Sequence, residues 1–340
     1  MFMTHLNLAI EHWPLHSPFT IARGTKTAAD VIVATLTDQQ GLIGRGEAVP
    51  YGHYGESTDS VYAQIMAVRD QIERPMTPQE LHQRNTLPPG AGRAAVDAAL
   101  WDLHARQTNL PVWRHTRQQP PHTYPTAYTL SLGSPAQMAT VAERVSTYPL
   151  LKLKLGGDND IACVTAVRNA APDCRLIVDV NEGWSLEQLN DYAPRMADLG
   201  VELLEQPLPP AQDTALDGYC GAVPLCADES FHHSDDFATL SAAYGYINIK
   251  MEKTGGLTEA LRCAEQAESM GLKLMVGCMV ATSLAMAPAF LLAGRAEYID
   301  LDGPLLLRND RPEGFVYHHG YMSWPPHSPK HTPLWGYASD

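Results

Sequence analysis

Short runs of alternating or continuous apolar residues recur at a regular interval after residue 120. Eight runs of β-strand character are centred on residues 128, 153, 178, 203, 226, 248, 275 and 300, so neighbouring centres lie 22 to 27 residues apart. Helix-like segments separate them, and several open with Ser, Thr or Asp and close with Gly, as capped helices do. A strand–helix unit repeated eight times predicts a (β/α)8 barrel. An open doubly wound sheet is the second choice, because its Gly-rich first turn is missing.

The first 120 residues follow another pattern. They read as a β-meander with turns at ARGTK (22–26) and DQQG (38–41), followed by helical segments. Strands followed by helices predict a separate α+β domain. We therefore expect an α+β domain over 1–118, a barrel over 119–305, and a C-terminal segment over 306–340 that packs back on the first domain.

Composition and charge narrow the class of protein. The 340 residues are 45% apolar and 18% charged, as in a globular protein, and a net charge of −14 argues against nucleic acid or an anionic membrane surface as the main partner. No apolar stretch reaches the roughly 18 residues of a membrane-spanning helix, and the start shows no secretory signal. The six cysteines form no C-x-x-C pair, which favours reduced thiols in a cytoplasmic protein.

The strand LKLKL (151–155) places two lysines, Lys152 and Lys154, on one face. In a barrel, the chemistry lies at the carboxyl ends of the strands, and polar residues end several of the predicted strands here. These residues are Lys152, Lys154, Asp179, Glu205, Asp228, Lys250, Asp300 and Asp302. The lysines of strands two and six stand half a circle apart, so their ammonium groups can approach one ligand from opposite sides.

Three successive strands each present one carboxylate, from Asp179, Glu205 and Asp228. A single acid at a strand end is usually a helix cap, but three in register repel one another unless a cation neutralises them. Oxygen ligands with open positions suit Mg²⁺. The sequence therefore predicts a magnesium site between the two lysine-bearing walls.

The set K-x-K at 152–154, Asp179, Glu205, Asp228 and Lys250 resembles the enolase superfamily, in its muconate-lactonising subgroup. GRGEAVPYGHYGES and AAVDAALWDLHAR look like that family's capping-domain segments. The resemblance implies one Mg²⁺ per subunit, held by the three carboxylates, which binds a substrate carboxylate and stabilises an enediolate. It also implies that Lys154 and Lys250 are acid/base groups, one on each face of the substrate, with Lys152 as an electrostatic helper. Two bases on opposite faces suit a racemase or epimerase.

Further residues indicate the substrate. The D-x-D of Asp300 and Asp302 resembles the dipeptide epimerases of the subgroup, where the pair holds the amine of a dipeptide, although one of the two could instead be a turn acid. Arg23 lies where the alanyl-glutamate epimerases place an Arg that meets the glutamate side chain, although a solvent-exposed turn Arg is as good a reading. Tyr51 is a possible wall, Thr126 a hydrogen-bonding group of uncertain role, and Cys278 more a packing residue than a nucleophile.

The resemblance implies a Mg²⁺-dependent dipeptide epimerase that inverts the α-carbon of the C-terminal residue, most simply glutamate in Ala-Glu from cell-wall peptides. The partner is then a small-molecule dipeptide, with a homo-oligomer as a possible assembly. An N-acylamino acid racemase or an o-succinylbenzoate synthase is the alternative within the subgroup, and their substrates leave the D-x-D without a function. A non-catalytic ligand-binding barrel is the alternative of another class, but it would be expected to have lost a lysine or a ligand.

Overall fold

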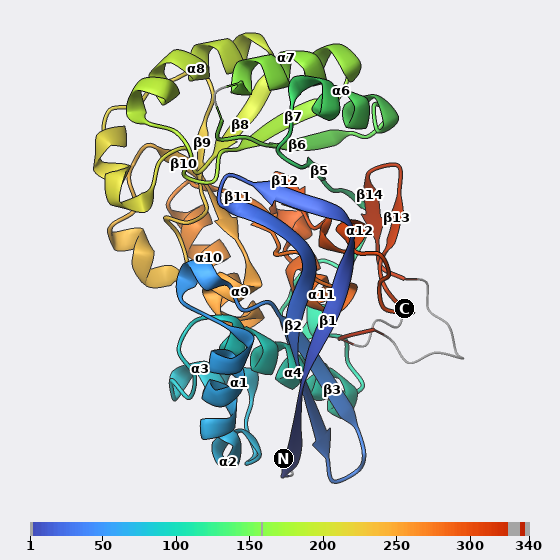
Figure 1. The fold of residues 1–340 in the computed structure, drawn as a ribbon. Helices are drawn as coiled ribbons and strands as arrows, with labels where there is room; N and C mark the ends of the chain where they lie inside the picture. The colour runs from blue at the N-terminus through green and yellow to red at the C-terminus, as the bar shows by residue number, and fades with distance from the viewer. Residues whose placement is uncertain (1–2, 158, 326–333, 337–340) are drawn as a thin grey trace.

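The structure is a computed structural model that describes residues 3–157, 159–325 and 334–336. Figure 1 shows a barrel surrounded by helices, and below it a smaller domain from which a long hairpin reaches up to the barrel. The eight-stranded sheet is parallel where its strands pair, and two three-stranded antiparallel sheets accompany it. This is the predicted (β/α)8 barrel with an N-terminal α+β domain, hereafter the capping domain.

The long hairpin of the capping domain consists of β1 (Thr4–Ile21) and β2 (Gly24–Asp38), and β3 (Ile43–Ala48) completes its sheet. Ile21 is paired with Gly24, so Ala22 and Arg23 form the turn between the strands. Both turns predicted from the sequence are present, because β2 and β3 pair antiparallel across the second one. The hairpin therefore carries Arg23 at its tip.

Helices follow the sheet of the capping domain, and the longest of them, α4, packs against β3. Gly46 of β3 makes this approach possible, because a Cβ atom there would lie only 2.1 Å from the carbonyl oxygen of Ala95. The helix and the sheet then bury a core of aliphatic side chains, which fixes the base of the hairpin. The helices are α1 (Thr58–Ala67), α2 (Arg69–Ile72), α3 (Pro78–Gln83) and α4 (Ala91–Thr108).

All eight strands predicted after residue 120 are present in one sheet, in sequence order. The backbone N–H of Ala127 donates to the carbonyl oxygen of Ile299 at 2.7 Å, which joins the first strand to the last and closes the barrel. The strands are β5 (Tyr128–Leu130), β6 (Leu150–Lys154), β7 (Arg175–Asp179), β8 (Val201–Glu205), β9 (Leu225–Ala227), β10 (Tyr244–Ile249), β11 (Lys273–Gly277) and β12 (Tyr298–Asp300).

The connections between strands depart from the predicted regular repeat in two places. Only the 3₁₀ turns η2 (Pro210–Leu216) and η3 (Ser234–Ala238) lie between β8 and β9 and between β9 and β10. These are the units with the shortest spacing, and prolines at 207, 209 and 210 disfavour a helix in the first of them. The longer helices are α6 (Pro135–Arg144), α7 (Asp160–Ala170), α8 (Leu186–Asp198), α10 (Leu257–Ser269) and α11 (Ser283–Phe290).

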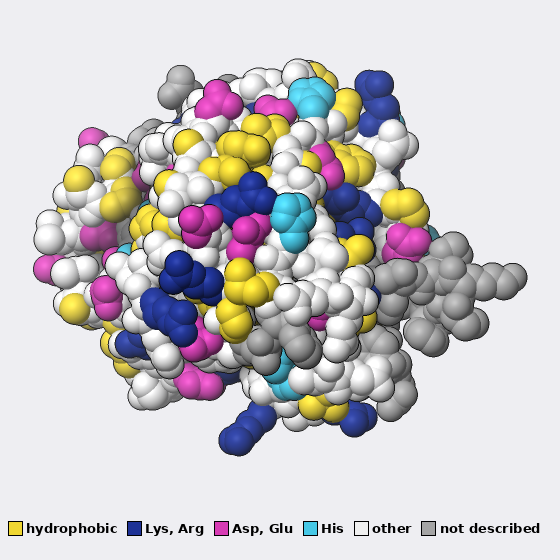
Figure 2. Space-filling view, turned by 90° about the horizontal axis from the view of Figure 1, so that it is seen from below, with side chains coloured by type: hydrophobic (Ala, Val, Ile, Leu, Met, Phe, Trp, Pro, Cys, Tyr) yellow, Lys and Arg dark blue, Asp and Glu magenta, His cyan; other side chains and the backbone are white. Residues whose placement is uncertain are grey.

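Shorter elements fill the remaining connections. They are η1 (Gly52–Tyr54), α5 (Val112–His115), α9 (Met251–Thr254), η4 (Ala293–Arg295) and α12 (Gly303–Leu306). Among the described helices, none combines the length and the apolar character that crossing a bilayer requires. On the face shown in Figure 2, basic side chains lie among acidic and neutral ones, so the negative net charge is not gathered into one patch there.

The C-terminal segment contacts both domains. Its strands β13 (Val316–His318) and β14 (Tyr321–Ser323) form a sheet with β4 (Tyr124–Pro125), which precedes the amino end of the first barrel strand. Further on, the indole N–H of Trp335 donates to the carbonyl oxygen of Ala98 in α4 at 3.0 Å. Part of this segment, residues 326–333 and 337–340, lies outside the described residues. The domain limits at 118 and 305 stay predictions.

Candidate active site

A cavity of about 440 Å³ lies between the tip of the hairpin and the carboxyl ends of the barrel strands. This volume is within the range of small-molecule sites, and barrel enzymes have their active sites at the carboxyl ends of the strands. The lining comes from the hairpin, from the segment around η1 and from the ends of the barrel strands. It includes Arg23, Lys26, Tyr51, Thr129, Lys152, Lys154, Asp228, Lys250, Asp300 and Asp302.

Lys152 and Lys154, which share one face of the strand, both line the cavity. The Lys152 side chain is 1% exposed, and its Nζ lies 2.6 Å from Asp300 Oδ2 and 2.7 Å from Glu205 Oε2. Burial alone would lower the pKa of Lys152, but the carboxylates around it outweigh this effect and raise the pKa well above its ordinary value. Lys152 is therefore a fixed positive charge beneath the cavity.

Lys154 and Lys250 stand on opposite walls of the cavity. They end β6 and follow β10, and three strands separate β6 from β10 in either direction around the closed sheet. Lys154 Nζ lies 2.5 Å from Asp179 Oδ2, and Lys250 Nζ lies 2.6 Å from Asp228 Oδ2. Each ammonium group thus reaches the space between the walls next to a carboxylate of the predicted metal site.

The three carboxylates of the predicted metal site end neighbouring strands and are buried. Asp179 is paired in register with Glu205, and Asp228 follows β9 directly. Burial and the charge of Asp179 raise the pKa of Glu205 to about 7, although Lys152 opposes them. A hard divalent cation would relieve the repulsion between these carboxylates, and their oxygen atoms are the ligands that such a cation prefers. The residues present therefore fit Mg²⁺.

As the side chains stand, ammonium groups balance the charges of these carboxylates. Asp179 pairs with Lys154 and Lys152, Glu205 with Lys152, and Asp228 with Lys250. Among the residues that the structure describes, no three Asp, Glu, His or Cys side chains are arranged to hold a metal ion in this state. The metal site consequently stays a proposal that requires these ion pairs to open.

Two buried polar residues next to the carboxylates were not predicted from the sequence. Lys253 Nζ lies 2.6 Å from Asp228 Oδ1, 2.6 Å from the Asp228 carbonyl oxygen and 2.8 Å from the Asn248 carbonyl oxygen. The amide of Asn248 donates to Glu205 Oε1 at 2.8 Å. Lys253 and Asn248 therefore orient Asp228 and Glu205 from behind. The polar residues flanking Lys250 in NIKMEK were the only signal for them.

Asp300 and Asp302 both line the cavity, as expected from the D-x-D spacing. Asp300 pairs with Lys152, whereas Asp302 Oδ2 accepts the backbone N–H of Thr129 at 2.6 Å. The side chain of Asp302 does not cap α12, although Asp302 is the residue before that helix. Burial and the neighbouring charge of Asp300 raise the pKa of Asp302 to about 7. A cationic ligand group beside Asp302 would reverse this effect.

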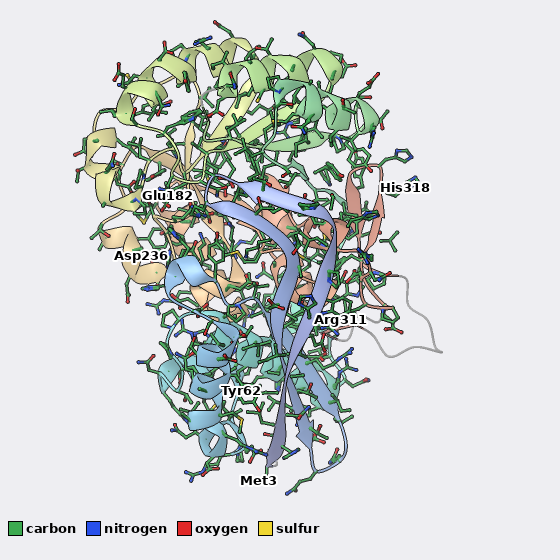
Figure 3. The ribbon with its side chains drawn as sticks, viewed as in Figure 1. Met3, Tyr62, Glu182, Asp236, Arg311 and His318 are labelled. Carbon is green, nitrogen blue, oxygen red and sulfur yellow. The ribbon has the colours of Figure 1, made fainter. Side chains whose placement is uncertain are left out.

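Arg23 joins the hairpin tip to the barrel. Its Nη2 lies 2.6 Å from Glu229 Oε1 and donates to the hydroxyl of Tyr51 at 3.1 Å, and its Nη1 lies 3.1 Å from Glu182 Oε2. Figure 3 shows Glu182 beside the end of the β1–β2 hairpin. The Glu229 side chain is 2% exposed, so this is a largely desolvated ion pair. Arg23 and Tyr51 do reach the cavity, but barrel carboxylates already engage the guanidinium.

Thr126, which was expected to contact the substrate, is not among the residues that line the cavity. It is fully buried, and its hydroxyl accepts the backbone N–H of Leu301 at 3.0 Å at the seam of the barrel. Thr126 precedes β5, at the end of the strand opposite to the cavity. Thr129, three residues further, lines the cavity in its place, because about 3.3 Å of rise per residue carries the chain toward the mouth.

Cys278 lies in the cavity wall after β11. Burial and the charges of Asp300 and Asp302 raise the pKa of its thiol well above the ordinary value. The thiolate that a nucleophile would need is thus disfavoured, in agreement with the packing role expected for Cys278.

Comparisons with known proteins bear on this arrangement. Residues 3–115 match the N-terminal domain of the mandelate racemase/muconate lactonizing enzyme family, and residues 136–329 match the enolase C-terminal domain-like family. An L-Ala-D/L-Glu epimerase of Escherichia coli is 45% identical over 88% of this chain and 93% of its own length. An N-acetyl-D-glutamate racemase of Pseudoalteromonas is 43% identical over 91% of this chain and 96% of its own length.

Solved structures agree with both the fold and the family. An enolase family member from Agrobacterium tumefaciens with homology to dipeptide epimerases, solved with sodium and L-Ala-L-Glu, has a TM-score of 0.93 at 45% identity. The match covers 98% of this chain and 100% of that one. A dipeptide epimerase of Enterococcus faecalis, complexed with Mg and L-Leu-L-Tyr, has a TM-score of 0.90 at 26% identity, with 99% of each chain covered. The chain therefore belongs to the mandelate racemase/muconate lactonizing enzyme family of the enolase superfamily.

Proposed function

We propose that the chain is a dipeptide epimerase that inverts the α-carbon of the C-terminal residue, most simply glutamate in Ala-Glu. The observation that carries the proposal is the position of Lys154 and Lys250 on opposite walls of one cavity. A proton can leave one face of a carbon between them and return to the other face. The 45% identity to an L-Ala-D/L-Glu epimerase supports the same reaction.

The lysines divide the work of a 1,1-proton transfer. The lysine on one wall, in its neutral form, takes the α-proton as that C–H bond breaks, and the ammonium group on the other wall donates a proton to the opposite face as a new C–H bond forms. The nearby carboxylates, Asp228 first among them, outweigh the effect of burial and raise the pKa of Lys250 well above its ordinary value. With the Asp228 ion pair in place Lys250 holds its proton, and it can act as a base only when that pair opens.

Asp179, Glu205 and Asp228 would hold a Mg²⁺ ion, consistent with the Mg²⁺ in the E. faecalis epimerase structure. When bound, the cation supplies the positive charge that stabilises the deprotonated substrate. Lys152 adds a second fixed charge on the same side of the cavity, since it is buried among Asp300, Glu205 and Asp179.

The other groups of the cavity would orient the dipeptide. Asp300 and Asp302 line the wall that suits an ammonium group, because Asp302 has no cationic partner among the described residues. Tyr51, near the hairpin tip, covers the opposite end of the cavity. The hairpin and the η1 segment together limit the access of water to the reacting carbon.

The test is to incubate the protein with Ala-Glu diastereomers and Mg²⁺ in D₂O and to follow the α-proton by NMR. We expect both diastereomers to exchange the glutamate α-proton and to interconvert. A non-catalytic binding barrel would bind the peptide and leave that proton in place. No exchange across a panel of dipeptides would refute the epimerase proposal.

An N-acylglutamate racemase is the second candidate, because an N-acetyl-D-glutamate racemase is 43% identical to this chain. The chemistry at the α-carbon would be the same, and only the ammonium group of the substrate distinguishes the two. We favour the dipeptide because two carboxylates, Asp300 and Asp302, face the cavity where an acetyl group offers no charge. The kcat/KM values for Ala-Glu and N-acetylglutamate decide between the candidates.

We also propose a role in the turnover of cell-wall peptides in the cytoplasm, since dipeptides containing D-glutamate derive from such peptides. The proposed partner is the small-molecule dipeptide itself. A homo-oligomer stays a prediction, which a sedimentation measurement would test.

A further inference from the structure

One face of α4 has no role in the chemistry proposed above. No residue of α4 is among those that line the cavity. Arg93, Asp97 and Trp101, hereafter the α4 clamp, follow one another at intervals of four residues, so they share one face of the helix. This face packs against the barrel at α9 and α10, the two helices that follow Lys250.

Asp97 caps α10 from the other domain. The residue before α10 is Gly256, which has no side chain to accept a hydrogen bond, and Asp97 accepts the backbone N–H of Thr258 at 3.2 Å in its place. Asp97 also accepts the Thr258 hydroxyl at 2.5 Å, and the indole N–H of Trp101 donates to that hydroxyl at 3.0 Å. A Cβ atom on Gly256 would lie 2.5 Å from Asp97 Cβ, so this approach requires a glycine.

Arg93 holds the other side of the same turn. Its guanidinium donates to the carbonyl oxygen of Thr254 at 2.9 Å and to that of Gly255 at 3.3 Å. These carbonyl groups end α9, which begins directly after Lys250. The backbone N–H groups of Lys253 and Thr254 both donate to the Lys250 carbonyl oxygen at 3.1 Å. A single helical turn therefore connects Lys250 to the α4 clamp.

The sheet holds the two proposed bases differently. Lys154 is the last residue of β6 and is paired in register with Asp179 of β7. Lys250 lies beyond β10, whose pairing with β11 ends at Ile249. The strand pairing thus fixes the backbone of Lys154, whereas the backbone of Lys250 depends on the turn that the α4 clamp holds.

We propose that the α4 clamp positions Lys250, and that it connects the capping domain to one of the two bases only. The inference rests on the proposed function, because only an enzyme with one base on each wall has a step that is specific to one face of the substrate. A displacement of Lys250 slows proton removal from the face that Lys250 serves and leaves removal by Lys154 in place. A general loss of stability, or of the metal, would slow both.

The experiment measures the rate at which each Ala-Glu diastereomer exchanges its glutamate α-proton in D₂O with Mg²⁺. Lys250→Ala identifies the diastereomer that Lys250 serves. We expect Asp97→Ala to slow the exchange of that diastereomer about tenfold or more relative to the other, mainly in kcat. Asp97→Asn keeps one acceptor oxygen and should restore part of the ratio. Thr258→Val, which removes only the shared hydroxyl, should change the ratio in the same direction and replaces Asp97→Ala should that variant not fold.

Asp102→Ala is the matched control. Asp102 is also a fully buried residue of α4, but it accepts the backbone N–H groups of Arg45 and Gly336 rather than groups of the barrel. Asp102→Ala should leave the ratio of the two exchange rates unchanged. An equal effect of Asp97→Ala on both diastereomers would overturn the inference.

A second measurement separates this inference from the proposed function. Should the wild-type protein exchange neither diastereomer, the proposed function fails, and the exchange of backbone amide hydrogens in the metal-free protein still tests the clamp. Faster amide exchange over residues 250–258 in Asp97→Ala, with no change over residues 150–154, would support the positioning of Lys250 by the clamp. Unchanged amide exchange over residues 250–258 would exclude it.

Discussion

Lys253 offers a direct test of the ion pairs beneath the candidate site. Its side chain is fully buried, and its ammonium group has three oxygen acceptors at 2.6 to 2.8 Å. Lys253→Met keeps much of the volume of the side chain and removes the charge, which leaves Asp228 Oδ1 and two carbonyl oxygens without this donor. Breaking a buried pair costs about 3–5 kcal/mol. Lys250 still pairs with Asp228 Oδ2 in the variant, so we expect a value at the lower end, about 3 kcal/mol.

This free energy converts into a measurable shift of the melting temperature. With about 2.1 cal/mol/K per residue, a chain of 340 residues has an unfolding entropy of about 0.7 kcal/mol/K, so 3 kcal/mol corresponds to about 4 °C. Circular dichroism of the metal-free protein measures it. Lys273→Met is the control, because the Lys273 side chain is 59% exposed and its pair with Glu297 should leave the melting temperature unchanged. If the melting temperature of the Lys253→Met protein lay within about 1 °C of the wild-type value, the ion pairs of Lys253 would not stabilise the fold as argued here.

Three further outcomes test the proposed chemistry. Lys154→Ala and Lys250→Ala should each lower the rate of epimerisation by about 10²-fold or more. Each variant should still exchange the α-proton of one diastereomer with D₂O. If either variant exchanged the α-proton of both diastereomers, the assignment of one base to each wall would be wrong. Asp302→Asn should lower kcat/KM about tenfold or more for Ala-Glu, and far less for N-acetylglutamate, in parallel assays. Mg²⁺ at 100 times its Kd should stabilise the wild-type protein by about 2.7 kcal/mol after EDTA treatment, and Glu205→Gln should lose most of this thermal shift.

The fold could be predicted because each of its strands is marked by residues that are neighbours in the sequence. Each barrel strand is a short apolar run, and the spacing between runs reflects one strand and one connection. The two departures, η2 and η3, fall where the spacing is shortest. Three prolines marked the first of them as unfavourable to a helix, whereas no such signal marked the second. The K-x-K and the strand-end acids were equally readable, because the carboxyl ends of barrel strands converge.

The hairpin contacts could not be predicted, since they join residues far apart in the chain. Glu229 is 206 positions from Arg23, and no local pattern marks it as the partner of a turn arginine. Thr126 was misplaced for another reason. The apolar run spans 126–130, but the strand β5 begins only at Tyr128. Thr126 therefore lies at the end opposite to the mouth, where its hydroxyl accepts the backbone N–H of Leu301.

The balance of charges connects these findings to the choice of substrate. Four ammonium groups, those of Lys152, Lys154, Lys250 and Lys253, are each paired with one or more of the carboxylates of Asp179, Glu205, Asp228 and Asp300. Asp302 lies outside this set, because it forms no ion pair with a cationic side chain of the described residues and its pKa is raised to about 7 by burial and the charge of Asp300. A ligand that brings its own ammonium group stabilises the ionised form of Asp302, and an acetyl group at the same place does not.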